Sequence, residues 1–522
     1  MERGTDRLHT IVAGLVASGQ LAGAQVVETH ISVVVLAGEH VYKFKKAVDL
    51  GFLDFSTLAL RKLNCEEELR LNRRLAPRYY LDVLPVTGTE QAPRLGGDGA
   101  AIEYCVRMRR FPSGQQFDEL VRAGALTAAH VQALAGRVAG FHADTPRAEP
   151  SMGTPEQVIA PARHNLDALE SARGLDADLK DELRKLRAWT EAAAAQLHET
   201  LLARHDGGFV RECHGDMHLA NITLDGEEIV IFDCIEFSAS LRCIDVMSEV
   251  AFVCIDLAHY GRADLANLFL NTYLEHTGDY AGVAVLRYYE VYRALVRAKV
   301  AAIRLDQPGI EKSELEAQHA RCRDYIRLAA SFLPAAPPAL IIAHGLSGSG
   351  KTRVSAALAQ RLGAVRLRSD VERKRLHGIA MLARSGSPVR GGIYAPGASA
   401  QTYARLRALA ETVLRAGHTA IVDAAFLKRE QRREFAALAA ALGLRFHILS
   451  VQAPEEELRR RLRARQAGGA DASEADTAVL EHQLATQEPL EETERDRAWL
   501  VDTTSASPEE AAERLAALHD RR

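Results

Sequence analysis

The stretch AHGLSGSGKTRV, residues 343–354, decides the fold of the C-terminal part of the chain. From Gly345 to Thr352 it follows the spacing G-x-x-x-x-G-K-[ST], in which glycines let backbone N–H groups converge on phosphate oxygens. We expect Lys351 to act on the β- and γ-phosphates of ATP and the Thr352 hydroxyl to ligate Mg²⁺. The residues assigned to ATP here are Gly345, Ser347, Gly348, Ser349, Gly350, Lys351 and Thr352.

Strand and helix patterns alternate around this loop. The apolar run ALIIA predicts a buried strand at 339–343, and further strands are predicted at 364–369, 419–424 and 445–451. They alternate with helices predicted from Lys351 and over 401–416, 428–442 and 454–466. Such alternation predicts an α/β P-loop NTPase domain with a doubly wound parallel sheet. Three prolines in SFLPAAPPAL, residues 331–340, predict a connector. We therefore divide the chain into domains at 1–334 and 335–522.

Polar residues follow the predicted strands of the second domain. Asp370 ends one strand and can accept the proton of a substrate hydroxyl, while Arg373 can bind an anionic substrate group. Asp423 ends another strand, and we expect it near Mg²⁺ or near the acceptor. Arg461 and Arg465 lie four apart on one helix face, where they can close over transferring phosphates. Solvated charged helix faces are the alternative interpretation of all these side chains except Asp423.

Four short motifs in this domain point to a family. GLSGSGKT at 345–352, SDVERK at 369–374, VDAAF at 422–426 and LRRRLRARQ at 458–466 resemble those of P-loop small-molecule kinases, in the group near gluconate kinase and zeta toxin. The resemblance implies Mg-ATP-dependent phosphorylation of a small acceptor. It does not fix which acceptor.

A second set of polar residues lies in CHGDMHLANITL, residues 213–224, and in IVIFDCIEF, residues 229–237. Phosphoryl transfer needs a base near the acceptor hydroxyl and oxygen ligands for the metal. Asp216 fits the catalytic base, and Asn221 with Asp233 fits the metal ligands. His214 is assigned to the catalytic group as a brace of the loop.

This pattern resembles the aminoglycoside phosphotransferase family, whose fold is that of protein kinases, over about residues 30–330. The resemblance implies an α+β two-lobed domain, with an N-lobe of about 1–105 and a C-lobe of about 106–334. It also implies an ATP-binding pair of a strand lysine and a helix glutamate. VYKFKK, residues 41–46, offers Lys43, and CEEELRLNRRL, residues 65–75, offers Glu68. Lys45 and Glu67 remain open alternatives.

The local patterns of the first domain agree with an order that begins with strands and ends with helices. A β-hairpin is predicted over 31–46 and a strand over 103–111. An amphipathic helix is predicted over 57–76, with Leu60, Leu63, Leu71 and Leu75 on its apolar stripe. Further helices are predicted over 127–145, 178–203, 245–276 and 283–305.

Composition narrows the classes of function. The chain has 522 residues, of which 47% are hydrophobic. Its net charge of −4 argues against a nucleic-acid or membrane-surface binder. It holds no run of about 18 apolar residues. Its cysteines, 7 in number, lack metal-ligand spacing and suit a reduced, cytoplasmic protein. We expect no nucleic-acid or membrane partner, and the oligomeric state is not predicted.

The whole arrangement resembles bifunctional proteins that join an aminoglycoside phosphotransferase to an ATP-binding kinase. We therefore expect a tandem ATP- and Mg²⁺-dependent kinase that acts on hydroxyl groups of small molecules, with one site in each domain. One alternative is that one domain senses nucleotide and regulates the other. A second alternative is a polynucleotide or nucleotide-sugar kinase, suggested by the basic clusters at 366–375 and 459–465.

Overall fold

The computed structural model describes residues 2–51, 53–172, 175–305, 311–383, 385–387, 391–468 and 475–520. Its contacts divide the chain into two compact units. The first comprises Met1–Asp167 with Leu201–Asp256, and the second comprises Ala168–Thr200 with Leu257–Arg522. Three of the helices therefore run from one unit into the other: α5 (Pro155–Ser171), α6 (Ala177–Asp206) and α8 (Val246–His259). The division at residue 335 stays a prediction.

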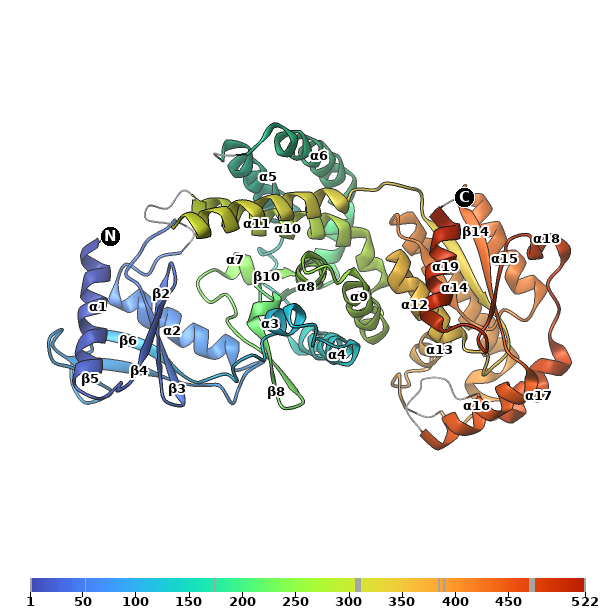
Figure 1. Ribbon diagram of the computed structural model, residues 1–522, viewed down its shortest axis with the longest axis horizontal. Coiled ribbons are helices and arrows are strands. Elements are labelled where there is room, and N and C mark those ends of the chain that lie inside the picture. The colour runs from blue at the N-terminus through green and yellow to red at the C-terminus, as the bar shows by residue number, and fades with distance from the viewer. Residues whose placement is uncertain are drawn as a thin grey trace. The chain divides into compact units, whose positions relative to one another are not determined.

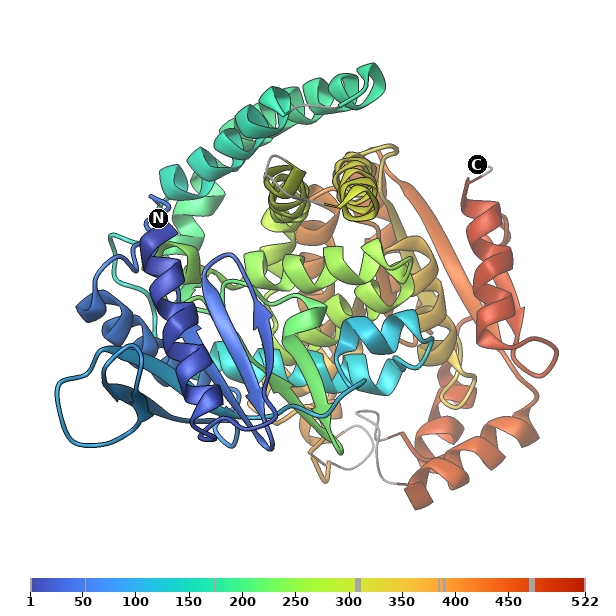
Figure 2. The same ribbon diagram turned by 60° about the vertical axis from the view of Figure 1, so that its left-hand side comes forward.

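A six-stranded antiparallel sheet forms the N-terminal part of the first unit, in the order β1-β2-β3-β6-β4-β5. Its strands are β1 (Gln25–Glu28), β2 (Ser32–Ala37), β3 (His40–Lys45), β4 (Tyr80–Gly88), β5 (Pro93–Leu95) and β6 (Glu103–Arg109). The hairpin predicted over 31–46 and the strand predicted over 103–111 are thus confirmed. Helix α1 (Glu2–Ala17) covers one face of the sheet (Figure 2). Ile11 and Leu15 of this helix pack with Phe44 of β3.

Helix α2 (Leu58–Asn72) has a buried face that carries charge. The predicted leucine stripe is wrong at Leu63, which is 60% exposed, whereas Arg61 and Glu68 are buried. Burying these charges is tolerated because each has a partner of opposite sign. Arg61 Nε lies 2.8 Å from Glu103 Oε1, and Glu68 lies between two lysines of β3.

The rest of the first unit holds the segments that carry the second set of motifs. It contains α3 (Phe117–Arg122), α4 (Ala128–Asp144), β7 (Val210–Glu212), the 3-10 turn η1 (Leu219–Asn221), β8 (Ile222–Asp225), β9 (Glu228–Ile231), α7 (Ala239–Arg242) and β10 (Cys243–Asp245). Strands β8 and β9 pair as an antiparallel hairpin, and β7 pairs with β10. The helix predicted over 245–276 is two helices, α8 and α9 (Ala263–Thr277), because Gly261 adopts φ 74° between them.

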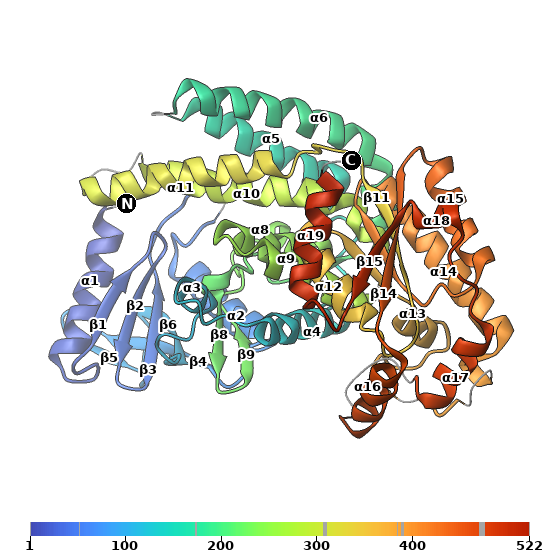
Figure 3. The ribbon, with the colours of Figure 1, turned by 45° about the vertical axis from the view of Figure 1, so that its right-hand side comes forward.

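A five-stranded parallel sheet in the second unit has the order β12-β13-β11-β14-β15. Its strands are β11 (Ala339–His344), β12 (Val365–Arg368), β13 (Ala420–Asp423), β14 (Arg445–Gln452) and β15 (Ala498–Asp502). Helices α12 (Lys351–Leu362) and α19 (Pro508–Asp520) cover one face, and α14 (Pro396–Arg415) and α15 (Arg429–Ala441) cover the other (Figures 1 and 3). The doubly wound α/β fold is confirmed.

The remaining helices of the second unit are α10 (Val283–Leu305), α11 (Lys312–Ser331), α13 (Ser369–Leu376), η3 (Gly392–Tyr394), α16 (Glu455–Gly468), α17 (Thr477–Thr486) and α18 (Glu492–Arg495), with η2 (Tyr280–Gly282) before α10. Across the described part of the chain, every helix is too short or too polar to cross a membrane. All 7 cysteines are buried free thiols.

Candidate active sites

Three predicted polar residues of the first unit lie at one end of the β8–β9 hairpin. Ile222 pairs with Ile231, so Asn221 and Asp233 flank the same end of the two strands. The Phe232 N–H donates to Asn221 O at 3.0 Å, and Asn221 Nδ2 donates to Asp216 O at 3.0 Å. The structure therefore brings Asp216, Asn221 and Asp233 together, as the expected roles of base and metal ligands require.

Asp233 has an unusual backbone conformation. Its φ is 64°, in a region that side chains other than glycine rarely adopt. Its N–H donates to Tyr80 Oη at 3.2 Å, which helps to hold the strained residue. Strain of this kind is retained where the surrounding structure fixes it, often at functional sites.

His214 ties the loop of Asp216 to the strand that precedes Asp233. His214 Nε2 lies 2.9 Å from Phe232 O, and the Asp216 N–H lies 3.3 Å from His214 Nδ1. Burial lowers the pKa of His214, which favours the neutral ring that these contacts require, with a donor at Nε2 and an acceptor at Nδ1. This geometry fits the expected bracing role.

Glu249 on α8 is a contributor that the sequence motifs do not reveal. Its Oε1 accepts the N–H groups of His214 and Gly215 at 2.8 and 2.7 Å, and its Oε2 lies 2.9 Å from His142 Nε2. Burial raises the pKa of Glu249, but these hydrogen bonds and the nearby histidines hold it below its ordinary value. A buried carboxylate thus fixes the backbone on which Asp216 is carried.

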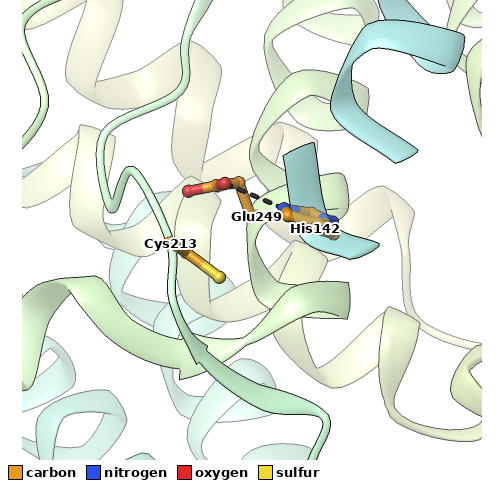
Figure 4. A group of neighbouring side chains, drawn as sticks. All are labelled: His142, Cys213 and Glu249. Atoms are coloured by element: carbon orange, nitrogen blue, oxygen red, sulfur yellow. Dashed lines mark hydrogen bonds and ion pairs between the residues drawn. The ribbon is translucent and has the colours of Figure 1, made fainter. Parts of the chain in front are cut away.

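Cys213 joins His142 and Glu249 in a group whose possible ligand atoms lie within 4.8 Å of one another (Figure 4). Metal binding would need a thiolate, but burial raises the pKa of Cys213 well above its ordinary value. The Glu249 oxygens are already occupied by hydrogen bonds. We therefore assign this group to the support of the loop.

Both candidate lysines of β3 reach Glu68. Lys43 Nζ lies 2.8 Å from Glu68 Oε1, and Lys45 Nζ lies 2.7 Å from Glu68 Oε2. Burial raises the pKa of Glu68, but the two ammonium charges hold it at about 2. The other candidate, Glu67, pairs instead with Arg70 and Arg242.

The two lysines differ in their second partners. Lys43, whose side chain is 12% exposed, also lies 2.5 Å from Asp233 Oδ1. Lys45 is fully buried and pairs with Glu236, three residues after Asp233. Only Lys43 therefore touches the candidate metal ligand, which agrees with its expected role at the ATP phosphates. Glu236 was not found from the sequence, because its spacing matches no part of the motif.

The loop before α12 has the conformation that its glycines allow. Gly345, Gly348 and Gly350 have φ of 142°, 84° and 94°. A Cβ atom on Gly345 would lie 2.2 Å from Val451 O, so the loop packs closely against β14. Lys351 Nζ donates to Leu346 O at 2.8 Å, which folds the lysine over the loop.

Asp370, Asp423 and Lys351 meet at the carboxyl ends of the parallel strands. Arg368 pairs with Asp423 across β12 and β13, and Asp370 lies in the first turn of α13 directly after β12. Burial lowers the pKa of Lys351 to about 8, against the opposing effect of Asp423 and Asp370. Among the described residues, the buried Asp423 Oδ2 has no hydrogen-bond partner.

A cavity of about 700 Å³ collects the predicted residues of this site. It is lined by Ser347, Gly348, Gly350, Lys351, Thr352, Asp370, Arg373, Asp423, Arg461 and Arg465, with other side chains. Gly345 and Ser349 lie in the same loop, and Ser349 Oγ is buried without a partner among the described residues.

Arg373 is 7% exposed and presents an unused donor within the second unit. Its Nη1 donates to Ile393 O at 2.8 Å and to Ser399 Oγ at 3.3 Å, and its guanidinium lies 5.0 Å from the centre of the Tyr394 ring. Its Nε has no hydrogen-bond partner among the described residues. A cation fixed in this way is suited to an anion in the cavity.

Arg461 and Arg465 on α16 both line the cavity, and each is held by neighbours. Arg461 Nε lies 2.6 Å from Glu457 Oε1, and Arg461 Nη1 donates to Thr503 Oγ1 at 2.7 Å. Arg465 Nη2 donates to Ala475 O at 2.5 Å. Gln483 of α17, not found from the sequence, accepts the Ser347 N–H at 2.8 Å.

Comparisons with known proteins match the two parts separately. Residues 53–295 match the model of the phosphotransferase enzyme family, and residues 340–490 match the model of an AAA domain. An uncharacterized protein of Mycobacterium tuberculosis strain H37Rv is 28% identical over 462 residues, which cover 87% of this chain and 88% of that protein.

Solved structures are similar to one part or the other. A choline/ethanolamine kinase family protein from Mesorhizobium loti is 17% identical and covers 62% of this chain and 99% of its own, with a TM-score of 0.37. A gluconokinase from Sinorhizobium meliloti 1021 is 22% identical, and the match covers 35% of this chain and 95% of the gluconokinase, with a TM-score of 0.27. By the family models, the chain joins a segment of the phosphotransferase enzyme family, residues 53–295, to an AAA domain, residues 340–490.

Proposed function

We propose that the chain is a tandem ATP-dependent kinase in which each site moves the γ-phosphoryl group of Mg-ATP to a hydroxyl group of a small molecule. The main support is the cavity in which Lys351, Asp370 and Asp423 meet beneath the glycine loop. Both sites would work in the cytoplasm, where ATP is supplied and the free thiols stay reduced.

The residues present fit Mg²⁺ and a nucleotide phosphate. Hard cations prefer oxygen ligands, and the buried Asp423 Oδ2 has no other partner among the described residues. Thr352 and Asp423 would hold Mg²⁺ in the second site, and Asn221 and Asp233 would hold it in the first. When bound, the metal neutralises charge on the phosphate oxygens.

The protein groups supply positioning and proton transfer. In the first site, Lys43 binds phosphate and Asp216 accepts the proton of the acceptor hydroxyl, while Glu68 and His214 keep them in place. In the second site, backbone N–H groups of Gly348 to Thr352 and the Lys351 ammonium bind phosphate, and Asp370 accepts the proton. Arg461 and Arg465 bind the transferring group from α16.

The acceptor of the second site carries an anionic group in this proposal. The buried Arg373 guanidinium, with its unused Nε donor, supports this choice, because an anionic group would both accept that hydrogen bond and compensate the buried positive charge, whereas a neutral oxygen would only accept the hydrogen bond. The net charge of −4 gives no support to a nucleic-acid acceptor.

The test uses two full-length variants, Asp216→Asn and Lys351→Ala, with ADP release measured over a panel of neutral and anionic hydroxylated metabolites. In each variant, turnover of the acceptors of one site should fall by about 100-fold or more. In the double variant, turnover of all acceptors should be lost. Asp225→Asn and Lys312→Ala are matched controls outside both sites. A wild-type chain that releases ADP with no acceptor of the panel would contradict the proposal.

The same assay decides between the alternatives. If Asp216→Asn abolishes phosphorylation of no acceptor but alters the nucleotide dependence of the second site, the first domain is a sensing module. If Arg373→Ala lowers turnover of neutral and anionic acceptors equally, Arg373 does not bind the acceptor's charge.

A further inference from the structure

Helix α9 carries a buried polar stripe that the proposed chemistry does not use. Asn267, Asn271 and Glu275 are spaced by four residues and therefore lie on one helix face. All are buried, and Glu275 is only 6% exposed. The helix lies in the second compact unit, although its sequence belongs to the segment that matches the phosphotransferase family.

This stripe faces β12, the edge strand of the P-loop sheet. Asn267 Nδ2 and Asn271 Nδ2 each donate to Ala364 O at 3.0 Å, and Asn271 Oδ1 accepts the Arg366 N–H at 2.6 Å. An edge strand leaves backbone groups unpaired, and here side chains of α9 pair them. Helix α9 is thus the structural neighbour that completes this edge.

Glu275 extends the contact toward the cavity. Its Oε1 lies 2.7 Å from Arg366 Nη2, and its Oε2 lies 3.2 Å from Arg368 Nη1. Burial raises the pKa of Glu275, but the two guanidinium charges hold it below its ordinary value, so the carboxylate is ionised.

Arg366 and Arg368 both contact the P-loop site. Arg366 Nη1 also donates to Thr352 O at 3.1 Å, the backbone of the residue expected to ligate Mg²⁺. Arg368 lines the cavity two residues before Asp370. The Glu275 carboxylate therefore fixes two side chains: Arg366, which contacts the backbone of Thr352, and Arg368, which lines the cavity.

We infer that Glu275 is a positioning residue of the P-loop site, and that α9, a helix of the phosphotransferase segment, is part of the support on which this second site depends. The inference rests on the proposed nucleotide binding at the P-loop. It assigns a role to Glu275, which is not among the residues that line the cavity and acts on the site through Arg366 and Arg368.

Hydrogen–deuterium exchange of the full-length chain, titrated with AMP-PNP and Mg²⁺, resolves the relevant segments separately. In the wild type, nucleotide should slow exchange in peptides covering 345–353, 364–368 and α9. Asn271→Ala leaves the local charge unchanged and should raise the nucleotide concentration that half-protects 345–353 by roughly three- to ten-fold, with protection of α9 lost. Glu275→Gln should act in the same direction.

A double variant separates positioning from a general loss of structure. If Glu275 acts through Arg368, Glu275→Gln combined with Arg368→Gln should shift the midpoint little further than Arg368→Gln alone. Glu411→Gln, which breaks the surface pair with Arg415 on α14, is the matched control and should leave the midpoint unchanged.

The outcomes distinguish the two hypotheses. Absence of protection at 345–353 in the wild type would overturn the proposed function and this inference with it. Protection there, together with unprotected α9 or with unchanged midpoints in Asn271→Ala and Glu275→Gln, would overturn the inference alone. Shifts of Glu275→Gln that are additive with both Arg366→Gln and Arg368→Gln would also overturn it.

Discussion

Lys43 Nζ lies 2.5 Å from Asp233 Oδ1. The pair joins the lysine expected at the ATP phosphates to the carboxylate expected at Mg²⁺. A metal ion and an ammonium group compete for the same oxygen, so in the proposed mechanism Mg-ATP would replace this pair by a lysine–phosphate and a metal–carboxylate contact. Glu68 remains as the second partner of Lys43 and keeps its side chain oriented during the exchange.

The two lysines of β3 should respond differently to the same substitution. Lys43→Met should lower turnover at the first site by about 100-fold or more with a small change in melting temperature. Lys45→Met should mainly destabilise the fold, because it leaves the buried Glu236 without its cation, at a cost of about 3–5 kcal/mol. Thermal unfolding and ADP release of both variants provide the check. The reverse assignment would identify Lys45 as the ATP lysine.

Removal of the Glu249 carboxylate should loosen the loop of Asp216. Glu249→Ala removes the carboxylate oxygen that accepts the N–H groups of His214 and Gly215, and loss of such a buried acceptor costs about 1–3 kcal/mol. Urea unfolding should show lower stability, and turnover at the first site should fall with it. Glu249→Gln keeps an acceptor oxygen and should lose less of both. Equal losses in the two variants would show that the carboxylate charge, rather than the acceptor, matters.

Gly348→Ala should abolish nucleotide binding at the P-loop. A Cβ atom on Gly348 would lie 2.9 Å from Leu458 O, a backbone atom that cannot easily move away. Gly363→Ala is the matched control, because Gly363 has φ 62° but no atom within 4 Å of its Cβ position. The control should lose about 1 kcal/mol of stability and keep its affinity. Calorimetry with Mg-AMP-PNP compares them, and intact binding by Gly348→Ala would contradict the close packing of Gly348 against α16.

Nucleotide affinity at the P-loop should decrease as the pH rises above 8. Burial lowers the pKa of Lys351 to about 8, so the free protein loses the ammonium form above that pH, whereas the bound phosphates require it. Binding must then take up a proton, and affinity falls by up to about ten-fold per pH unit. Calorimetry between about pH 6.5 and 9.5 tests this. Lys351→Arg keeps its charge and should show a flat profile over that range.

Local patterns predicted most elements of the fold, since strands and helices such as β11 and α12 follow directly from apolar runs and the glycine loop. The prediction failed where burial depends on partners far away in the sequence. The buried face of α2 carries Arg61 and Glu68 rather than Leu63, because Glu103 and Lys43 supply opposite charges. No helical periodicity contains that information.

The same limit applies to the sites. Asp216, Asn221 and Asp233 were accessible because their spacing reflects one short hairpin. Glu249 was not, because it supports the loop of Asp216 from helix α8, and no local pattern fixes that contact. Glu236 lies only three residues after Asp233, but its partner Lys45 is on β3, far away in the sequence. The choice of Lys43 over Lys45 stays a prediction, since both reach Glu68.

The pairing of Ala364 and Arg366 backbone groups by α9 limits how this chain can be divided or recombined. A fragment that starts at the proline connector would lack Asn267 and Asn271 of α9. The edge of β12 would then expose unpaired backbone groups, which favours aggregation. A fusion of this P-loop half to a foreign partner would have the same defect. These amide contacts thus tie the P-loop sheet to a helix that precedes the proline connector, independent of whether the substrates of the two sites are related.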